Sequence, residues 1–158
     1  GIQIDTKNFT LRTGSRTFDA ASYLRANGAD SNLIQFFMKE KFSDFKARTH
    51  LINLAVVADG YAIVCGEVDS VYSGLITAQA ADELLQISGV EASFVITKRA
   101  DGRVGISARS TGQRNVQRVM EAMGGGGHLS NAATQLTDTT TDEVNDQLLK
   151  ILAEYVEE

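Results

Sequence analysis

The sequence contains no proline and a single cysteine, Cys65, which has no second cysteine with which to form an internal disulfide. Without proline, no proline-rich hinge divides the chain. Its 158 residues suit one domain, or a small domain and part of another, and need neither disulfide nor metal to stabilise the core. Cys65 lies in the apolar run 61–65, where we expect a small buried hydrophobe in a reducing cytoplasm.

Long hydrophobic runs are also absent. The richest stretch, residues 51–58, is interrupted by Asn53 and falls far short of the ~20 apolar residues of a membrane span. No basic segment followed by an apolar one marks a signal peptide. The chain starts at Gly1 without methionine and enters an apolar stretch at once, which is typical of a cut through a longer protein. We expect no membrane contact by this part.

Charge is unevenly distributed along the chain, whose formal net charge is −5. Residues 98–118 hold six basic side chains against one acidic residue, Asp101, so the remainder is strongly acidic. A long track for nucleic acid needs many phosphate contacts, which such a chain does not offer. The basic segment instead favours a local anion site.

Periodicity and turn residues predict an α/β fold with a small mixed sheet covered by helices, preceded by a mostly helical segment. Before the basic segment we expect a strand over 1–5 and three helices: one over 18–26, one from Asp30 or Ser31, and one from Ser43 that includes Val56. A strand over 61–68 and a helix over 76–87 are expected next. A change in pattern at 42–43 predicts two domains, residues 1–42 and residues 43–158.

The clearest local pattern is a hairpin that turns at Ala100-Asp101-Gly102. Alternation on its return arm predicts one apolar and one polar face, the polar one formed by Arg103, Gly105, Ser107 and Arg109. Asn115 is expected to cap a helix whose apolar stripe enters the core, namely Val116, Val119, Met120 and Met123. Thr140-x-x-Glu143 predicts a capping box at the start of the last helix.

Four consecutive glycines follow the stripe, and we expect them to form a loop. Gly124 is explained as a helix C-cap, but Gly125, Gly126 and Gly127 are not, and each costs backbone entropy when ordered. Such a run is favoured where another group approaches the backbone or where N–H groups bind phosphate. Lys-Ser or Lys-Thr does not follow, so this is not a P-loop, and the spacing does not match a dinucleotide fingerprint. His128 is expected to donate to a phosphoryl oxygen or to stack on a base.

The motif Gly124-Gly125-Gly126-Gly127-His128, with Asn131-Ala132-Ala133 after it, resembles the signature of the DHH-associated domain. That domain is the substrate-recognition half of DHH phosphodiesterases. The stretch 106–110 is similar to the family strand that contributes a phosphate-binding arginine and serine. Residues 1–9 resemble the last metal motif of the DHH domain, and residues 9–21 look closest to the GdpP subfamily of membrane-anchored cyclic di-AMP phosphodiesterases.

The resemblance implies that residues 1–42 end a DHH domain and that residues 43–158 form the DHH-associated domain. The implied phosphate-binding residues are Arg109, Ser110, Gly124, Gly125, Gly126, Gly127 and His128, joined by Arg12 and Arg16, which could reach the same anion. Of the ligands for two manganese ions, only Asp5 is present, and one carboxylate does not hold a two-metal site. We therefore expect a parent enzyme that hydrolyses cyclic di-AMP to linear pApA, and an isolated fragment that is inactive.

Two alternatives share parts of this pattern. One is a fragment of an oligoribonuclease or RecJ-like exonuclease acting on short RNA. The other is a non-catalytic RNA-binding module, because DHH-associated domains also occur on alanyl-tRNA synthetases, although a pI of about 5.0 disfavours it. The implied partners are a cyclic dinucleotide or short oligonucleotide and the rest of the DHH domain, and a homodimer is compatible. The implied location is the cytoplasmic side of a membrane-anchored parent.

Overall fold

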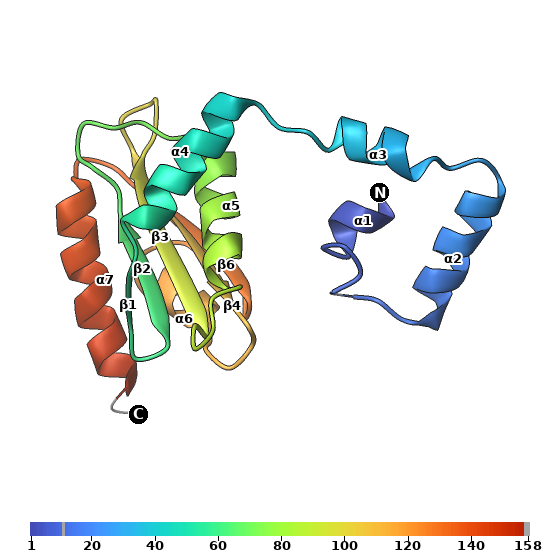
Figure 1. Ribbon diagram of the computed structural model, residues 1–158. Helices are drawn as coiled ribbons and strands as arrows, with labels where there is room; N and C mark the ends of the chain where they lie inside the picture. The colour runs from blue at the N-terminus through green and yellow to red at the C-terminus, as the bar shows by residue number, and fades with distance from the viewer. Residues whose placement is uncertain (11, 157–158) are drawn as a thin grey trace. The chain divides into compact units, whose positions relative to one another are not determined.

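The structure is a computed structural model that describes residues 1–10 and 12–156. Residue 11, which belongs to the stretch 9–21, and residues 157 and 158, which end the predicted second domain, lie outside the described residues. The chain divides into two compact units, Gly1–Glu40 (unit 1) and Lys41–Glu158 (unit 2) (Figure 1). The domain boundary at 42–43 stays a prediction, since the two units are defined by contacts alone.

Unit 1 consists of three helices, α1 (Ile2–Asp5), α2 (Ser15–Ala26) and α3 (Ser31–Phe37), and no side chain within them is buried. Asp30 caps α3 as expected, because its carboxylate accepts a hydrogen bond from the backbone N–H of Asn32 at 2.8 Å. The strand predicted over residues 1–5 is wrong. The Thr6 hydroxyl donates to Ile2 O at 2.6 Å and closes a helical turn, which the pair Ile2 and Ile4 fits as well as a strand.

Unit 2 contains a mixed six-stranded sheet in the order β1-β2-β3-β4-β6-β5. The strands are β1 (Val56–Ala58), β2 (Tyr61–Cys65), β3 (Ala92–Lys98), β4 (Val104–Ser110), β5 (Gly126–His128) and β6 (Asn131–Leu136). Only β2 and β3 are parallel, and every other neighbouring pair is antiparallel. The α/β class with a small mixed sheet is therefore confirmed.

Helices cover both faces of this sheet. They are α4 (Phe42–Asn53), α5 (Gly74–Leu84), α6 (Val116–Ala122) and α7 (Thr141–Val156). On one face α5 lies over β3 and β4, and α4 packs against α5. On the other face α6 lies over β5 and β6, and α7 lies over β2 and β3 (Figure 1). None of the helices among the described residues combines the length and apolar character needed to cross a bilayer.

Two separate hydrophobic clusters form the core of unit 2, one on each side of the sheet. Phe94, Ile106 and Leu148 belong to the cluster under α6 and α7, whereas Leu51 and Val95 belong to the cluster under α4 and α5. The stripe predicted for α6 is confirmed, because all four of its side chains are buried in the first cluster: Val116, Val119, Met120 and Met123. Burial of this kind is the main stabilising contribution to a domain.

Several boundaries differ from the predicted ones. Asp59 and Gly60 both have positive φ, 53° and 81°, and form a two-residue hairpin turn that requires a strand on each side. The strand before it, β1, was predicted as the end of a helix, and the strand after it ends at Cys65 instead of residue 68. Helix α4 begins at Phe42, so Ser43 lies in its first turn and is not its N-cap.

Candidate anion-binding site

Strand register places three polar residues of the basic hairpin and the glycine motif in one row. Arg109 of β4 is paired with Asn131 of β6, which is paired with His128 of β5. Residues directly opposite one another in antiparallel strands project from the same face of the sheet. The structure therefore brings Arg109 and His128 to one face, with Asn131 between them.

That face is the one on which α5 packs. Arg109 Nε donates to Asp82 Oδ1 of α5 at 3.0 Å, and Arg109 Nη1 donates to Ala108 O at 3.0 Å. The Arg109 side chain is 17% exposed, so this ion pair is largely shielded from water. In the described part of the chain no hydrogen bond engages Nη2. A guanidinium held in this way keeps one edge for an anion.

Beyond α5 the same face of the sheet is open. In β6 the side chains of Asn131, Ala133 and Gln135 are exposed, and they alternate with residues buried on the other face. In β5, Gly126 is directly opposite Ala133 and so belongs to this face too. We call this strip the open face; it consists of the exposed residues Asn131, Ala133, Gln135 and His128 and the partly buried residues Arg109 and Gly126. It presents backbone, amide, imidazole and guanidinium groups on one side of the sheet.

The four glycines do not form a loop, because Gly126 and Gly127 belong to strand β5. Gly124, with φ 78°, ends α6, and Gly125 N donates to Met120 O at 2.8 Å. A Cβ at Gly125 would lie 2.8 Å from Thr134 Cα, and a Cβ at Gly127 would lie 2.8 Å from Ala132 Cβ. Close packing against β6 therefore explains both residues.

Gly126 is different from its neighbours. A Cβ added at Gly126 would meet nothing within 4 Å, and its φ is not in the left-handed region. Neither packing nor backbone strain in this structure requires glycine there. Gly126 lies on the open face, so its missing side chain leaves the backbone of β5 uncovered there.

Ser110 is not on the open face. Its hydroxyl accepts hydrogen bonds from Gly112 N at 2.9 Å and Arg114 N at 3.3 Å, and its own N–H donates to Ser130 O at 2.9 Å. The side chain is buried and shapes the segment between β4 and α6. Strand alternation puts it on the side opposite Arg109, so the structure separates the two members of the predicted arginine and serine pair.

The remaining predicted residues lie in unit 1. Asp5 is exposed on α1, Arg12 precedes α2 with φ 49°, and Arg16 is exposed in the first turn of α2. Within residues 1–10 and 12–156, no group of three or more histidine, cysteine, aspartate or glutamate side chains is placed to hold a metal ion. Asp5 by itself therefore does not fit a two-metal centre.

Sequence reasoning missed Asp82 and gave Asn131 no role of its own. Asp82 lies 27 positions before Arg109, and no local sequence pattern predicts their ion pair. Asn131 was identified only as part of the glycine motif. The sequence also contains a signal for the hairpin that joins β5 and β6, and that signal would have paired Asn131 with His128. His128 and Asn131 flank a two-residue turn, and pairing them would have predicted the row.

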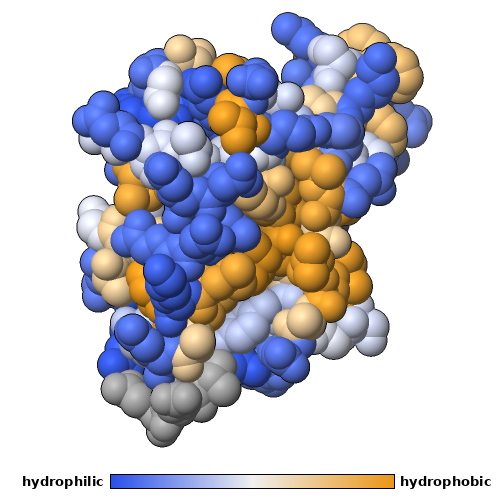
Figure 2. Space-filling view, turned by 90° about the vertical axis from the view of Figure 1, so that its left-hand side faces the viewer, coloured by the Kyte–Doolittle hydropathy of each residue, from blue (hydrophilic) through white to orange (hydrophobic). Residues whose placement is uncertain are grey.

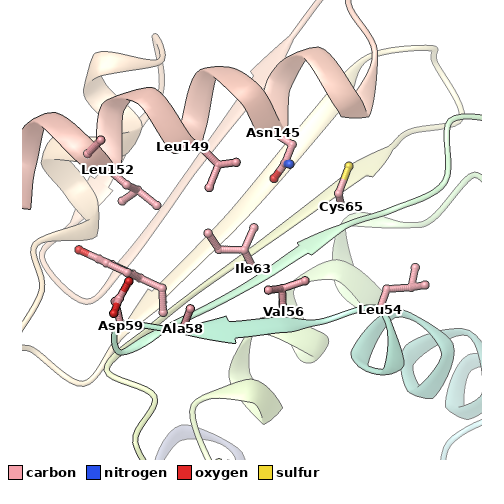
Figure 3. A pocket seen from close by; sticks show the side chains of 11 residues that line it. Leu54, Val56, Ala58, Asp59, Ile63, Cys65, Asn145, Leu149 and Leu152 are labelled. Atoms are coloured by element: carbon pink, nitrogen blue, oxygen red, sulfur yellow. The ribbon is translucent and has the colours of Figure 1, made fainter.

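A hollow of about 640 Å³ lies elsewhere in unit 2, between strands β1 and β2 and helix α7. Figure 2 shows apolar side chains gathered around it. Figure 3 shows Ile63 and Cys65 of β2 pointing toward Asn145 and Leu149 of α7 across this space. Cys65 was expected to be a buried hydrophobe, but it is only half-buried and lines the hollow.

Two effects favour the neutral form of the Cys65 thiol. Burial first, and then a hydrogen bond to Asp142, raise the pKa of the Cys65 thiol to about 11. Cys65 Sγ lies 3.5 Å from Asp142 Oδ1. A thiol with so high a pKa is a poor nucleophile at neutral pH. The described lining of the hollow therefore has neither an activated cysteine nor a basic side chain such as Arg109 of the open face.

Comparison with known proteins relates the chain to a domain family and to longer proteins. The family model described as DHHA1 domain matches residues 60–158. The chain is 58% identical over 156 residues to the cyclic-di-AMP phosphodiesterase PdeA of Listeria monocytogenes, covering 98% of this chain. It is 55% identical over 158 residues to the cyclic-di-AMP phosphodiesterase GdpP of Geobacillus thermodenitrificans, covering 99% of this chain. The chain spans about a quarter of the length of these relatives, 24% in each case.

A solved structure is similar in fold. The exopolyphosphatase-related protein from Bacteroides fragilis superimposes with a TM-score of 0.82 over 100% of this chain and 50% of its own. Sequence identity is 20%, so the likeness concerns the fold alone.

Proposed function

Since the chain belongs to the DHHA1 domain family, we propose that it is the substrate-binding part of a phosphodiesterase that hydrolyses cyclic di-AMP to linear pApA. The observation that carries the proposal is the row of Arg109, Asn131 and His128 on the open face. Two relatives named cyclic-di-AMP phosphodiesterases, each more than half identical over nearly the whole chain, support the choice of ligand.

Each group of the open face has a specific task in this proposal. The Arg109 guanidinium binds a phosphate through the edge that Asp82 and Ala108 leave unused. His128 donates to a phosphoryl oxygen or stacks on adenine, and both tasks suit an exposed imidazole. Gly126 lets the ligand approach the backbone of β5. Gly124, Gly125 and Gly127 support the site through the helix end and the packing of β5.

Asp82 positions Arg109. Its carboxylate fixes the guanidinium by the 3.0 Å hydrogen bond to Nε, and half-burial keeps this bond from being screened by water. Ser110 acts at a distance by holding the segment that follows β4. Arg12 and Arg16 are proposed to reach the same anion in the longer protein.

The metal centre belongs to the remainder of the longer protein in this proposal. Asp5 would contribute one ligand for manganese there, and the other ligands come from chain beyond these 158 residues. The isolated chain is therefore expected to bind nucleotide without hydrolysing it. We further propose that the longer protein is membrane-anchored, with this part on the cytoplasmic side.

The test is a titration of the 158-residue chain with cyclic di-AMP, linear pApA and tRNA, in the wild type and in two variants. Arg109→Gln removes the proposed phosphate ligand and is expected to weaken binding of pApA by about 10- to 100-fold, the usual effect of a charged hydrogen bond. Arg103→Gln is the control, because Arg103 is an exposed arginine of the same hairpin, paired with Asp101.

Two results would contradict the proposal. Equal affinity of Arg109→Gln and the wild type for pApA would make Arg109 a structural residue of the sheet. Tighter binding of tRNA than of either dinucleotide, at the same salt concentration, would favour the RNA-binding module.

A further inference from the structure

Arg99 lies on the same face of the sheet as Arg109 but at the opposite end of α5. Thr97 of β3 is paired with Gly105 of β4, and Arg99 follows Thr97 by two residues on that face. Gly105 and Arg109 are four residues apart on one strand, which is a distance of ~13 Å. The two arginines therefore stand at the two ends of the strip of sheet beside α5.

The Arg99 guanidinium is held in place by hydrogen bonds. Its Nη1 donates to Thr77 Oγ1 at 2.6 Å and to Thr97 Oγ1 at 2.9 Å. A Cβ added at Gly105 would come within 2.6 Å of Arg99 Nη2, so the guanidinium lies directly over the backbone of β4. The absence of a side chain at Gly105 makes room for this arrangement.

The charge of Arg99 is not balanced by a directly bound carboxylate among the described residues. In the described part of the chain Arg99 forms no ion pair, and Asp101, the acid two positions on, is bound by Arg103 at 2.8 and 2.6 Å. Arg99 Nε is buried without a hydrogen-bond partner. Burial lowers the pKa of Arg99, and the charge of Asp101 offsets this only in part.

The N-terminal end of α5 adds positive potential at the same place. A Cβ at Gly74, the first residue of α5, would lie 3.9 Å from Arg99 Cζ. A helix N-terminus carries partial positive charge, which disfavours a neighbouring cation. A neutral side chain would satisfy the two threonines without this cost, since their hydroxyls already lie 2.8 Å apart in a hydrogen bond to each other.

We propose that Arg99 forms a second anion subsite, which binds one phosphate group of a dinucleotide whose other phosphate is bound by Arg109. The proposal rests on the proposed function, because it takes the same ligand and the same face. An incoming phosphate would neutralise both the guanidinium and the end of α5. A ligand with two phosphates offers one phosphate to each arginine, whereas a mononucleotide with one phosphate does not.

The test is an NMR titration of the 158-residue chain with pApA, AMP and inorganic phosphate, which gives the affinity for each ligand. Arg99→Gln is expected to weaken pApA binding by about 10-fold or more and to leave AMP binding unchanged. Arg103→Gln, from the same turn and of the same charge, should match the wild type for both ligands. Arg99→Lys keeps the charge and should lie between the wild type and Arg99→Gln.

The wild-type protein gives a second measurement that needs no substitution. The Arg99 Nε–H resonance is expected to shift on addition of pApA and to stay in place with AMP. No shift with pApA, or wild-type pApA affinity in a folded Arg99→Gln variant, overturns the second subsite. A shift with inorganic phosphate but none with pApA also overturns it, because the anion would then not belong to the dinucleotide.

The same titrations separate failure of the subsite from failure of the proposed function. If Arg109→Gln loses affinity for both nucleotides while Arg99→Gln matches the wild type, only the second subsite is wrong. If the wild-type chain binds neither nucleotide, the proposed function fails as well.

Discussion

Unit 1 and unit 2 differ in how far they bury their apolar side chains. Unit 2 buries a hydrophobic cluster on each face of its sheet, whereas no side chain in the three helices of unit 1 is buried. Large apolar side chains of unit 1 are instead exposed, among them Phe18, Tyr23, Phe36 and Phe37. Unit 2 therefore has a packed hydrophobic core, whereas unit 1 has large apolar side chains that are not packed into a core.

Unit 1 also contains a hollow of about 510 Å³, which is a second sign that its apolar side chains are not closely packed. Apolar residues of all three helices line it, including Ile2, Leu24 and Phe37. Exposed apolar surface of this kind is typical of a surface that contacts another protein, a membrane or a ligand. The difference between the units therefore agrees with a chain that spans about a quarter of the length of its relatives.

The largest expected effect tests this difference with one substitution in each unit. Phe94 in unit 2 is fully buried, and Phe94→Ala should lower the free energy of unfolding by about 3–5 kcal/mol. Phe37 in unit 1 is 74% exposed, and Phe37→Ala should change it by less than about 0.5 kcal/mol. Urea unfolding followed by circular dichroism measures both. Similar losses from the two variants would remove the distinction between the units.

A smaller effect is expected within the glycine motif of unit 2. Gly125→Ala and Gly127→Ala place a methyl group against β6 and should each cost about 1–3 kcal/mol of stability. Gly127 also has φ 145°, which disfavours any side chain there. Thermal melts of the two variants would show this loss. If both melted like the wild type, the glycines would not belong to the packing of unit 2.

The smallest of the three effects concerns Cys65 as a reporter of the packing of unit 2. Because the native thiol has a pKa of about 11, against 9.0 when unperturbed, its neutral form stabilises the fold fully below pH 9. This contribution is lost as the pH rises from about 9 through 11, since the unfolded chain releases its proton first. Alkylation by iodoacetamide at pH 9 should be at least about tenfold slower in the native protein than in urea. Equal rates would mean that the region around β2 and α7 is not packed as described.

Local patterns predicted most of unit 2. The pair Asp101-Gly102 marks a hairpin turn, Asn115 caps α6 by accepting from Arg118 N, and Thr140 and Glu143 form the expected capping box. Each of these signals lies within a few residues of the structure that it specifies. Unit 1 was harder, because four residues such as Ile2–Asp5 fit one helical turn as well as a strand, and nothing buried selects between them.

The candidate site was only partly predictable for a related reason. Alternation placed Arg109 on the polar face of its strand, and the structure agrees. The ion pair with Asp82 and the row with Asn131 depend on how α5 and β6 pack beside β4, which no local pattern contains. The four glycines were predicted as a loop because a run of glycine has no periodicity, yet two of them form an edge strand.

Gly126→Ala tests most directly the claim that the open face of unit 2 binds a phosphorylated dinucleotide. A methyl group there meets no protein atom within 4 Å, so the variant should melt within a few degrees of the wild type. If a ligand approaches the backbone of β5, the same methyl group should weaken binding of pApA by about tenfold or more, which calorimetric titration of the 158-residue chain can measure. Unchanged affinity in a variant of unchanged stability would contradict the account, because the one glycine of the motif that packing leaves unexplained would then have no part in binding.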